Sequence, residues 1–434
     1  MMKETHWKKR FAAALAGGFL VLHTVSALAA PIELTLEESI AQALQNNPAI
    51  KVAASEKQAA AAGIDAAKGG KLPYLQLTHT DERRKSYGSS GTSSIGNTFS
   101  NTATVGMQLY TGGKIEGNIE KAKLGLLVAD LDVEKSRQKI KLDATNGYFT
   151  ILQAQNTVKV DQEAVDQMAA HLKNVEAQYN VGTVAKSDVL RSQVELANNQ
   201  QVLTKAQNAY ELAVSNLNNV MGLPLDTEIK IKDELVHEPY KLSLGDSIQY
   251  AIKNRPESIQ ADHAVAIAKE SVKVAKGDKL PTVSASASKY WADKDFAGTD
   301  DNGWSIGLKA TWTPFDSGVT NAGIKKSNFE VEKSLQSAKQ IKDSVQLEVR
   351  QAYLNMIEAE KRIDTSQVTV EKAEEDFKIA QVRYSAGVGT NIDVIDAQVA
   401  LTQAKNNYIQ AMYDFNTSKA NLTKAMGVPV TEVK

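Results

Sequence analysis

The chain consists of two similar halves, and this duplication limits the folds that are open to it. Residues near the start of each half recur 208 positions apart (242 − 34), and residues further along recur 205 positions apart (353 − 148). The first set is Leu34, Leu36, Ser39, Asn46, Pro48 and Pro73, which return as Leu242, Leu244, Ser247, Asn254, Pro256 and Pro281. The second set is Tyr148, Tyr179, Gly182, Asp188 and Pro224, which return as Tyr353, Tyr384, Gly387, Asp393 and Pro429. Such a repeated order indicates one supersecondary unit that is built twice.

Residues 1–29 have the three parts of a secretory signal peptide. The segment 3–10 is basic, the segment 11–22 is apolar, and residues 27–29 read Ala-Leu-Ala, a small-residue cleavage site. The apolar run is short for a spanning helix, which disfavours the alternative of an uncleaved anchor. We expect the mature chain to begin near Ala30 and to leave the cytoplasm.

The composition excludes several classes of protein and of site. The chain has no cysteine, which rules out disulfides, thiolate metal sites and a cysteine nucleophile. A formal net charge of −1 gives no electrostatic support for nucleic-acid binding. The six histidines are scattered, and we find no metal-ligand pair, phosphate loop or nucleophile–base motif. We therefore expect no enzyme, no cofactor and no metal site.

Each half is expected to open with two short helices and to close with two long ones. Proline at helix starts and glycine after helix ends mark the short helices, at 36–46 and 49–68 and again at 244–254 and 257–277. Proline-free stretches predict long helices over 114–220 and 319–426, interrupted at Gly182 and Gly387. The first repeat thus covers 30–221 and the second 242–427, with a connector at 222–241 and a tail at 428–434.

Between the short and the long helices the hydrophobic period changes to two, which is typical of β-strands. Hairpins are predicted at about 72–110 and 280–315, with polar loops at about 88–98 and 292–303. The clearest strand has the apolar members Trp304, Ile306, Leu308, Ala310 and Trp312. Tryptophans at both ends of such a stripe match a tilted transmembrane strand, so these side chains are expected to face lipid and Lys309 an aqueous lumen. A soluble β-sandwich edge is the alternative.

Four membrane strands cannot close on themselves, because membrane barrels begin at about eight strands. An open edge in hydrocarbon would leave backbone groups unpaired, at several kcal/mol each. Several copies of the chain must therefore share one barrel if the strands lie in a membrane. The long helices taken alone leave a plain antiparallel coiled-coil stalk open.

The order and spacing of the motifs resemble the TolC-type outer-membrane efflux protein family over essentially the whole mature chain. The matching pieces are Leu34-x-Leu36 with Asn46-Asn-Pro48, Lys71-Leu-Pro73, Gln108-Leu-Tyr-Thr-Gly-Gly113, Tyr179-Asn-Val-Gly182 with Asp188-Val-Leu190, and Tyr384-Ser-Ala-Gly387 with Asp393-Val-Ile-Asp396-Ala-Gln398. The resemblance implies a mainly α fold with a transmembrane β part. It implies a homotrimer in which a twelve-stranded β-barrel, four strands from each chain, stands on a long periplasmic α-helical barrel.

The resemblance also implies a function and its partners. Members of the family are exit ducts in the outer membrane for small molecules or for proteins secreted by the type I route. They work with a periplasmic adaptor and with an inner-membrane efflux pump or ABC transporter, and their barrels contact outer-membrane lipid. The alternative function is not transport: the chain would be an exported structural or adhesive coiled-coil stalk without channel activity.

The same resemblance places the turns at Gly182 and Gly387 at a periplasmic tip, with candidate gating and selectivity residues beside them. These are Asp188, Asp393, Asp396, Tyr384, Lys186 and Arg191. A ring of acids in a trimer would favour cations, although an acid in a first helical turn also stabilises the helix dipole. The two basic residues could form interhelical locks or solvated pairs, and the tyrosine could hydrogen-bond or simply pack.

Overall fold

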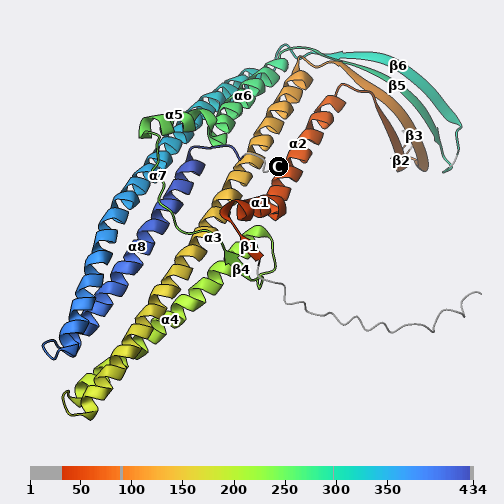
Figure 1. The fold of residues 1–434 in the computed structure, drawn as a ribbon. Coiled ribbons are helices and arrows are strands. Elements are labelled where there is room, and N and C mark those ends of the chain that lie inside the picture. Colours follow the sequence, from red (N-terminus) through yellow and green to blue (C-terminus); the bar gives the residue numbers. More distant parts are fainter. Residues whose placement is uncertain (1–31, 88–90, 297, 431–434) are drawn as a thin grey trace, which may run out of the picture.

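In the computed structural model the described residues are 32–87, 91–296 and 298–430. They form an elongated, mainly helical molecule with a four-stranded sheet at one end (Figure 1). The predicted signal peptide, 1–29, and residues 431–434 of the predicted tail lie outside the described residues.

The two halves contain the same kinds of element in the same order. The first half comprises β1 (Ile32–Leu34), α1 (Leu36–Asn46), α2 (Pro48–Gly69), β2 (Tyr74–Tyr87), β3 (Ser93–Tyr110), α3 (Lys114–Asn180) and α4 (Lys186–Met221). The connector contains β4 (Ile229–Ile231), and the second half then comprises α5 (Leu244–Asn254), α6 (Pro256–Gly277), β5 (Thr282–Asp293), β6 (Asp301–Thr311), α7 (Val319–Ser385) and α8 (Asn391–Ala425). Strands β1 and β4 pair in parallel and join the first half to the connector.

Two long helices run along most of the molecule. α3 and α7 have 67 residues each, a length of about 100 Å at 1.5 Å per residue. α4 folds back along α3 and α8 along α7, so that two helical hairpins form the end opposite the sheet (Figure 1). None of the described helices is both long enough and apolar enough to cross a membrane.

Shorter helices continue each long pair from the middle of the molecule towards the sheet. α2 begins where α4 ends, and the Asn47 side chain there donates to Val220 O over 2.9 Å. In the second half α6 begins where α8 ends, and the Arg255 guanidinium donates to Ala425 O over 3.2 Å. The two joints are 208 residues apart (255 − 47), so the duplication repeats the joint but changes its chemistry.

Apolar cores hold each hairpin to the short helices near the middle of the molecule. In the first half Tyr148, Leu217 and Met221 are fully buried in a cluster that α1 completes. In the second half Met356 and Phe415 belong to the matching cluster under α5. The transfer of these large side chains out of water stabilises each junction in the same way.

The four long strands form one antiparallel sheet in the order β2-β3-β5-β6. One row across the sheet consists of Leu75, Val105, Ala287 and Ile306. The next row on the opposite face consists of Gln76, Thr104, Ser288 and Ser305. Opposed residues share a face, so the sheet has one apolar face and one face lined with hydroxyl groups. Strands β2 and β6 are its two edges.

The hairpin loops are shorter than the sequence analysis predicted. β2 and β3 stay paired up to Tyr87 and Ser93, and β5 and β6 up to Ala292 and Asp301. The loops predicted at 88–98 and 292–303 are wrong to this extent, because ladder hydrogen bonds continue the strands where both faces are polar. β6 ends at Thr311, so Trp312 lies just beyond it and donates its indole N–H to Lys279 O over 3.0 Å.

Tight turns join the sheet to the long helices. Gly113 and Gly318 precede α3 and α7 with φ of 83° and 90°, values that favour glycine. A methyl group added at Gly112 would lie 2.5 Å from Gly277 O, so no side chain fits between these segments. In the second half the Asp316 carboxylate accepts from the N–H of Thr320 over 2.7 Å and fixes the start of α7.

Candidate functional site at the helical tip

The two helical hairpins turn at the same end of the molecule, farthest from the sheet (Figure 1). Gly182 and Gly387 have φ of 81° and 75° in these turns. Their N–H groups donate to Tyr179 O over 2.9 Å and to Tyr384 O over 3.0 Å. The positions predicted as tip turns are thus local reversals that require glycine-like backbone angles.

An apolar cluster joins the two hairpins just behind these turns. Its buried members come from all four long helices: Val175, Val189, Phe377, Ala380, Tyr384, Val394, Ala397 and Leu401. The tip of one chain is therefore a packed unit and not two separate hairpin ends.

Asn391, the first residue of α8, is a buried polar link between the hairpins. Its Oδ1 accepts from His171 Nε2 over 2.7 Å and from Ser192 Oγ over 3.2 Å. Its Nδ2 donates to Asp188 O over 3.1 Å. Because Oδ1 can only accept, the neutral His171 ring carries its proton on Nε2. One amide thereby binds α3 and α4 to α8.

The same cluster includes Tyr384, whose ring meets the His171 ring edge to face at a centroid distance of 5.0 Å. Burial lowers the pKa of His171, and the hydrogen bond with Asn391 opposes this effect only in part. Burial, and then the charge of Asp188, raises the pKa of Tyr384. Its hydroxyl is buried without a hydrogen-bond partner among the described residues. The link is therefore made of neutral groups at pH 7.

The three predicted acids have different surroundings. Asp393 forms a capping box, because its carboxylate accepts from Thr390 N–H over 2.9 Å while its own N–H donates to Thr390 Oγ1. The hydrogen bond from the Thr390 backbone lowers the pKa of Asp393. Asp188 is half-buried in the first turn of α4, and Asp396 is exposed on α8. Asp393 thus begins a helix, whereas Asp396 has no such local role.

The two predicted basic residues are both exposed. The Lys186 ammonium lies 5.2 Å from the centroid of the Tyr179 ring, a cation–π contact. No ion pair joins Lys186 or Arg191 to the predicted acids within the described chain.

Sequence analysis missed His171, Asn391 and Ser192 as parts of this site. A signal was present on α3, where the buried residues Ala164, Met168, His171 and Val175 follow helical spacing. A polar residue in such a stripe needs a buried partner. The partner lies 220 residues away in the sequence, and no local pattern identifies it.

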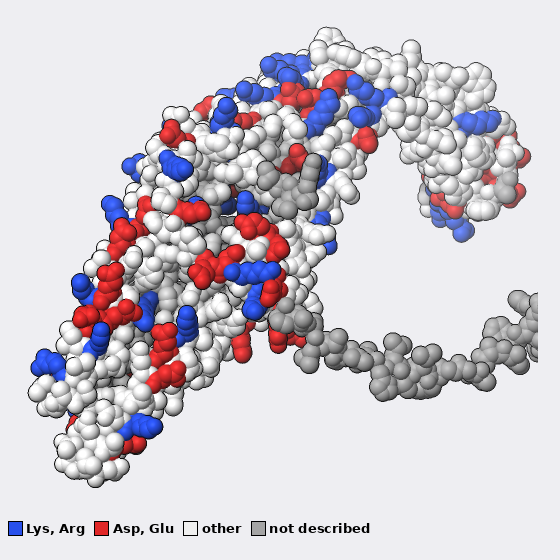
Figure 2. All heavy atoms as spheres, in the orientation of Figure 1, with Lys and Arg blue, Asp and Glu red and all other residues white. Residues whose placement is uncertain are grey.

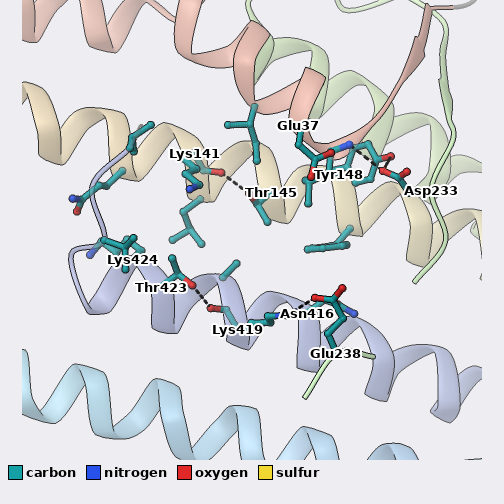
Figure 3. Close-up of a pocket in the computed structure, with 18 of the residues that line it drawn as sticks. Glu37, Lys141, Thr145, Tyr148, Asp233, Glu238, Asn416, Lys419, Thr423 and Lys424 are labelled. Carbon is teal, nitrogen blue, oxygen red and sulfur yellow. Dashed lines mark hydrogen bonds and ion pairs between the residues drawn. The ribbon is translucent and has the colours of Figure 1, made fainter. Parts of the chain in front are cut away.

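A cavity of about 710 Å³ lies near the middle of the molecule, between α1, α3, α8 and the connector (Figure 3). Tyr148 donates to Asp233 Oδ2 over 2.6 Å, and Lys419 pairs with Glu238 over 3.1 Å. Burial raises the pKa of Tyr148, which keeps it a donor. These contacts fasten the connector to α3 and α8. Among the described residues no group of three or more His, Cys, Asp or Glu side chains could hold a metal ion.

The sheet carries a second exposed feature. In Figure 2 the visible charges gather on the helices and at the far end of the sheet, whereas the part of the sheet near the helices shows almost none. On the apolar face Trp304, Ile306 and Leu308 are at least 75% exposed. A contiguous exposed apolar surface of this kind marks a site of interaction with a protein or a membrane.

The family model of outer membrane efflux proteins matches the chain twice, over residues 39–223 and 247–428. The chain belongs to the outer membrane efflux protein family. This family consists of outer-membrane channels, and the predicted resemblance to TolC-type proteins is confirmed.

Among efflux-family relatives, the outer membrane protein TolC of Escherichia coli is 22% identical over 89% of this chain and 80% of its own length. The alkaline protease secretion protein AprF of Pseudomonas aeruginosa is 22% identical over 97% of this chain and 89% of its own length. The toluene efflux pump outer membrane protein TtgF of Pseudomonas putida is 23% identical over 90% of this chain and 83% of its own length.

Solved structures of efflux-family channels have the same fold. The CmeC outer membrane channel of Campylobacter jejuni matches with a TM-score of 0.79 and 18% identity, over 92% of this chain and 87% of that one. CusC matches with a TM-score of 0.77 and 18% identity, over 90% of this chain and 96% of that one.

Asn391→Leu should loosen the tip, because it leaves the buried partners on α3 and α4 without their hydrogen bonds. We expect a cost of about 1–3 kcal/mol in local stability, measured by hydrogen exchange of the amides in the last turns of α3 and the first turns of α4 and α8. Asn198→Leu, on an exposed position of α4, is the matched control and should leave exchange unchanged. Equal exchange in both variants would contradict the role of Asn391.

The tip should lose stability as the solution becomes acidic. The pKa of His171 is lower in the folded chain than the unfolded value of about 6.5, so the unfolded state binds more protons below that pH. The contribution of neutral His171 is therefore complete above about pH 6.5 and declines as pH falls towards the lowered pKa. Hydrogen exchange at the tip across this range should show the slope, and His171→Phe should remove it. A slope that persists in His171→Phe would assign the effect to other groups.

Proposed function

We propose that this protein is the outer-membrane exit duct of an efflux or type I secretion system and that it acts as a homotrimer. Three chains place their four-stranded sheets side by side in a twelve-stranded barrel, and their helices form a periplasmic tube. The apolar sheet face contacts outer-membrane lipid, and the hydroxyl-lined face borders the lumen.

The observation that carries this proposal is the combination of two free sheet edges with one apolar face. Among the described residues, β2 and β6 each present an edge without a neighbouring strand. In hydrocarbon those backbone groups need partners, and β6 of one copy and β2 of the next supply them when the copies form a closed ring. Because a closed barrel has no edges, association and membrane insertion satisfy the same groups.

The family match supports the partners of the duct. TolC-type ducts contain no energy source, so an energised inner-membrane transporter, an efflux pump or an ABC transporter, drives the cargo. A periplasmic adaptor joins that transporter to the helical tip. The names of the relatives include both toluene efflux and alkaline protease secretion, and the cargo of this chain is accordingly a small molecule or a secreted protein.

The alternative, an exported stalk without channel activity, is tested directly against the duct. Purified protein in detergent should have the mass of three chains after correction for bound detergent, and in planar bilayers it should conduct ions. A monodisperse monomer, or a trimer that never conducts, would refute the exit-duct proposal.

Leu308→Arg should impair assembly in the membrane. The arginine would enter the lipid-facing surface and cost roughly 2–4 kcal/mol near the midplane. Ser305→Arg introduces the same side chain on the hydroxyl-lined face of the same strand and should be tolerated, as should Lys309→Ala. The yield of folded trimer in the outer membrane measures the difference. Similar yields for the two arginine variants would show that the faces are misassigned.

We further propose that Asp188, Asp393 and Asp396 line the periplasmic entrance and favour cations there, with Tyr384 and Arg191 beside them. Asp396 tests this cleanly, because it is exposed and takes no part in the capping box. Asp396→Asn should reduce the cation preference of the open channel, measured as the reversal potential under a salt gradient. Asp364→Asn, an exposed acid on α7 farther from the turn, should not. An unchanged reversal potential in Asp396→Asn would remove this acid from the entrance.

A further inference from the structure

The chain contains one seam between its two helical hairpins, and the duplication implies a second. Within the chain α3 of the first half lies against α8 of the second half. Their repeat counterparts are α7 and α4, which lie at opposite sides of the row of helices α7, α8, α3 and α4 (Figure 1). The faces of α7 and α4 that correspond to the seam are therefore directed away from the chain.

Burial on α8 and α4 shows this difference at matching positions 205 residues apart. Ile395 is 5% exposed at the seam, whereas its counterpart Leu190 is 51% exposed. Thr417 is 9% exposed, whereas its counterpart Leu212 is 57% exposed. α4 thus carries apolar side chains in the open where α8 buries the equivalent positions.

The same holds for α7 when it is compared with α3. His171 is buried at the seam, and its counterpart Asp376 is exposed (171 + 205). Thr145 is buried, and its counterpart Arg350 is exposed. Along α7 the exposed apolar side chains of Leu347, Leu354, Val368 and Val382 fall on one heptad phase, with the charged Lys361 and Glu375 at the two intervening positions. Apolar side chains that recur on one phase of a helix can pack against a neighbouring helix.

We propose that α7 of one subunit packs against α4 of the next in the register of the α3–α8 seam, and that Lys186 forms an ion pair there with Asp376 of the partner subunit. This inference rests on the proposed trimer and adds its register and its chemistry. The His171–Asn391 hydrogen bond fixes the register within the chain. Shifting both residues by 205 positions gives Asp376 and Lys186 (391 − 205).

The charges of the mapped positions are complementary. Neither Lys186 nor Asp376 makes an ion pair within the described chain, and they carry opposite charges. The Gln153–Gln410 contact, 2.6 Å long, maps onto Glu358 and Lys205, again an acid and a base, although Glu358 also pairs with Arg362 of its own helix.

Three more contacts of the seam test the register for conflicts. The Thr150–Tyr413, Asp161–Asn406 and Glu163–Lys405 contacts map onto Asn355–Asn208, Ser366–Gln201 and Val368–Gln200. All three mapped pairs are uncharged, so they neither oppose this register nor add to the argument for it. Ser366 is buried within its own chain, where its hydroxyl donates to Arg362 O, so it is not part of the outward face of α7.

The two kinds of seam therefore differ in chemistry. At the tip, the polar contacts of the seam within a subunit are neutral hydrogen bonds beside an apolar cluster, whereas the inferred contact between subunits is a charge pair. Salt screens exposed charge pairs and has little effect on neutral hydrogen bonds. The seams between subunits are thus the ones that ionic strength, or a charged partner at the tip, would weaken first.

The test uses pairs of cysteines, which the natural chain lacks. Lys186→Cys with Asp376→Cys, treated with a short bismaleimide in the assembled trimer, should give covalent dimers and trimers on a denaturing gel. Glu163→Cys with Lys405→Cys, a pair 3.1 Å apart within one chain, should give a monomer with an internal link. Lys186→Cys with Glu374→Cys is the matched control, since Glu374 contacts Lys405 on α8 of its own chain, and it should give no link between subunits.

Charge exchange provides a second readout. Lys186→Asp should lower the temperature at which the trimer dissociates, and Lys186→Asp combined with Asp376→Lys should restore it. Mass and conductance are measured on the same preparations. Conducting trimers without the 186–376 link and without restoration would overturn the inference and leave the exit duct intact. Monomers that do not conduct would overturn both.

Discussion

The free edges of the sheet are the constraint on which the rest of the molecule depends. β2 and β6 end a four-stranded sheet with an apolar face, and hydrocarbon offers their backbone groups no hydrogen bonds. In the proposed trimer, neighbouring copies of the chain complete the ladder. Because each strand is joined to a helix at one of its ends by a short connection, the arrangement of the strands also sets the order of the helices below them. The positions of α4 and α7 at the two sides of the row of helices follow from the positions of β2 and β6 at the two edges of the sheet.

Much of this architecture could be predicted because it is encoded in periodic and local signals. The alternation around Ile306, the proline at the start of α2 and the glycines of the tip turns each act within a few residues. Because the chain is duplicated, each of these weak local patterns occurs in both halves and supports the same prediction twice. Strand ends were less predictable, since a polar stretch such as the one before Phe99 remains in a strand when a neighbouring strand pairs with it. Asn391 was not predictable, because its partners on α3 and α4 are about 200 residues away.

The helical part combines two kinds of contact. Clusters of buried apolar side chains stabilise the packing within each hairpin and against its short helix. Between the hairpins of one chain, along much of the seam, the contacts are hydrogen bonds such as Gln153–Gln410 and a charged pair, Lys405–Glu163. Water can replace a hydrogen bond at small net cost, whereas separating an apolar cluster exposes its whole area. Away from the tip, where an apolar cluster joins the two hairpins, the seam is therefore held less strongly than the hairpins themselves.

The joints at Asn47 and Arg255 have a mechanical consequence. Each long helix is continuous from the tip turn to the sheet, but the helix beside it is interrupted halfway and restarted by one side chain. An uninterrupted ladder of backbone hydrogen bonds resists bending, and an interruption gives bending a preferred location. The Arg255 joint is further tied by ion pairs to Glu257 and Glu348, whereas Asn47 provides only amide hydrogen bonds. The interruption at Asn47 is therefore held by fewer and weaker contacts than the one at Arg255, so the two halves are not mechanically equivalent at the middle of the molecule.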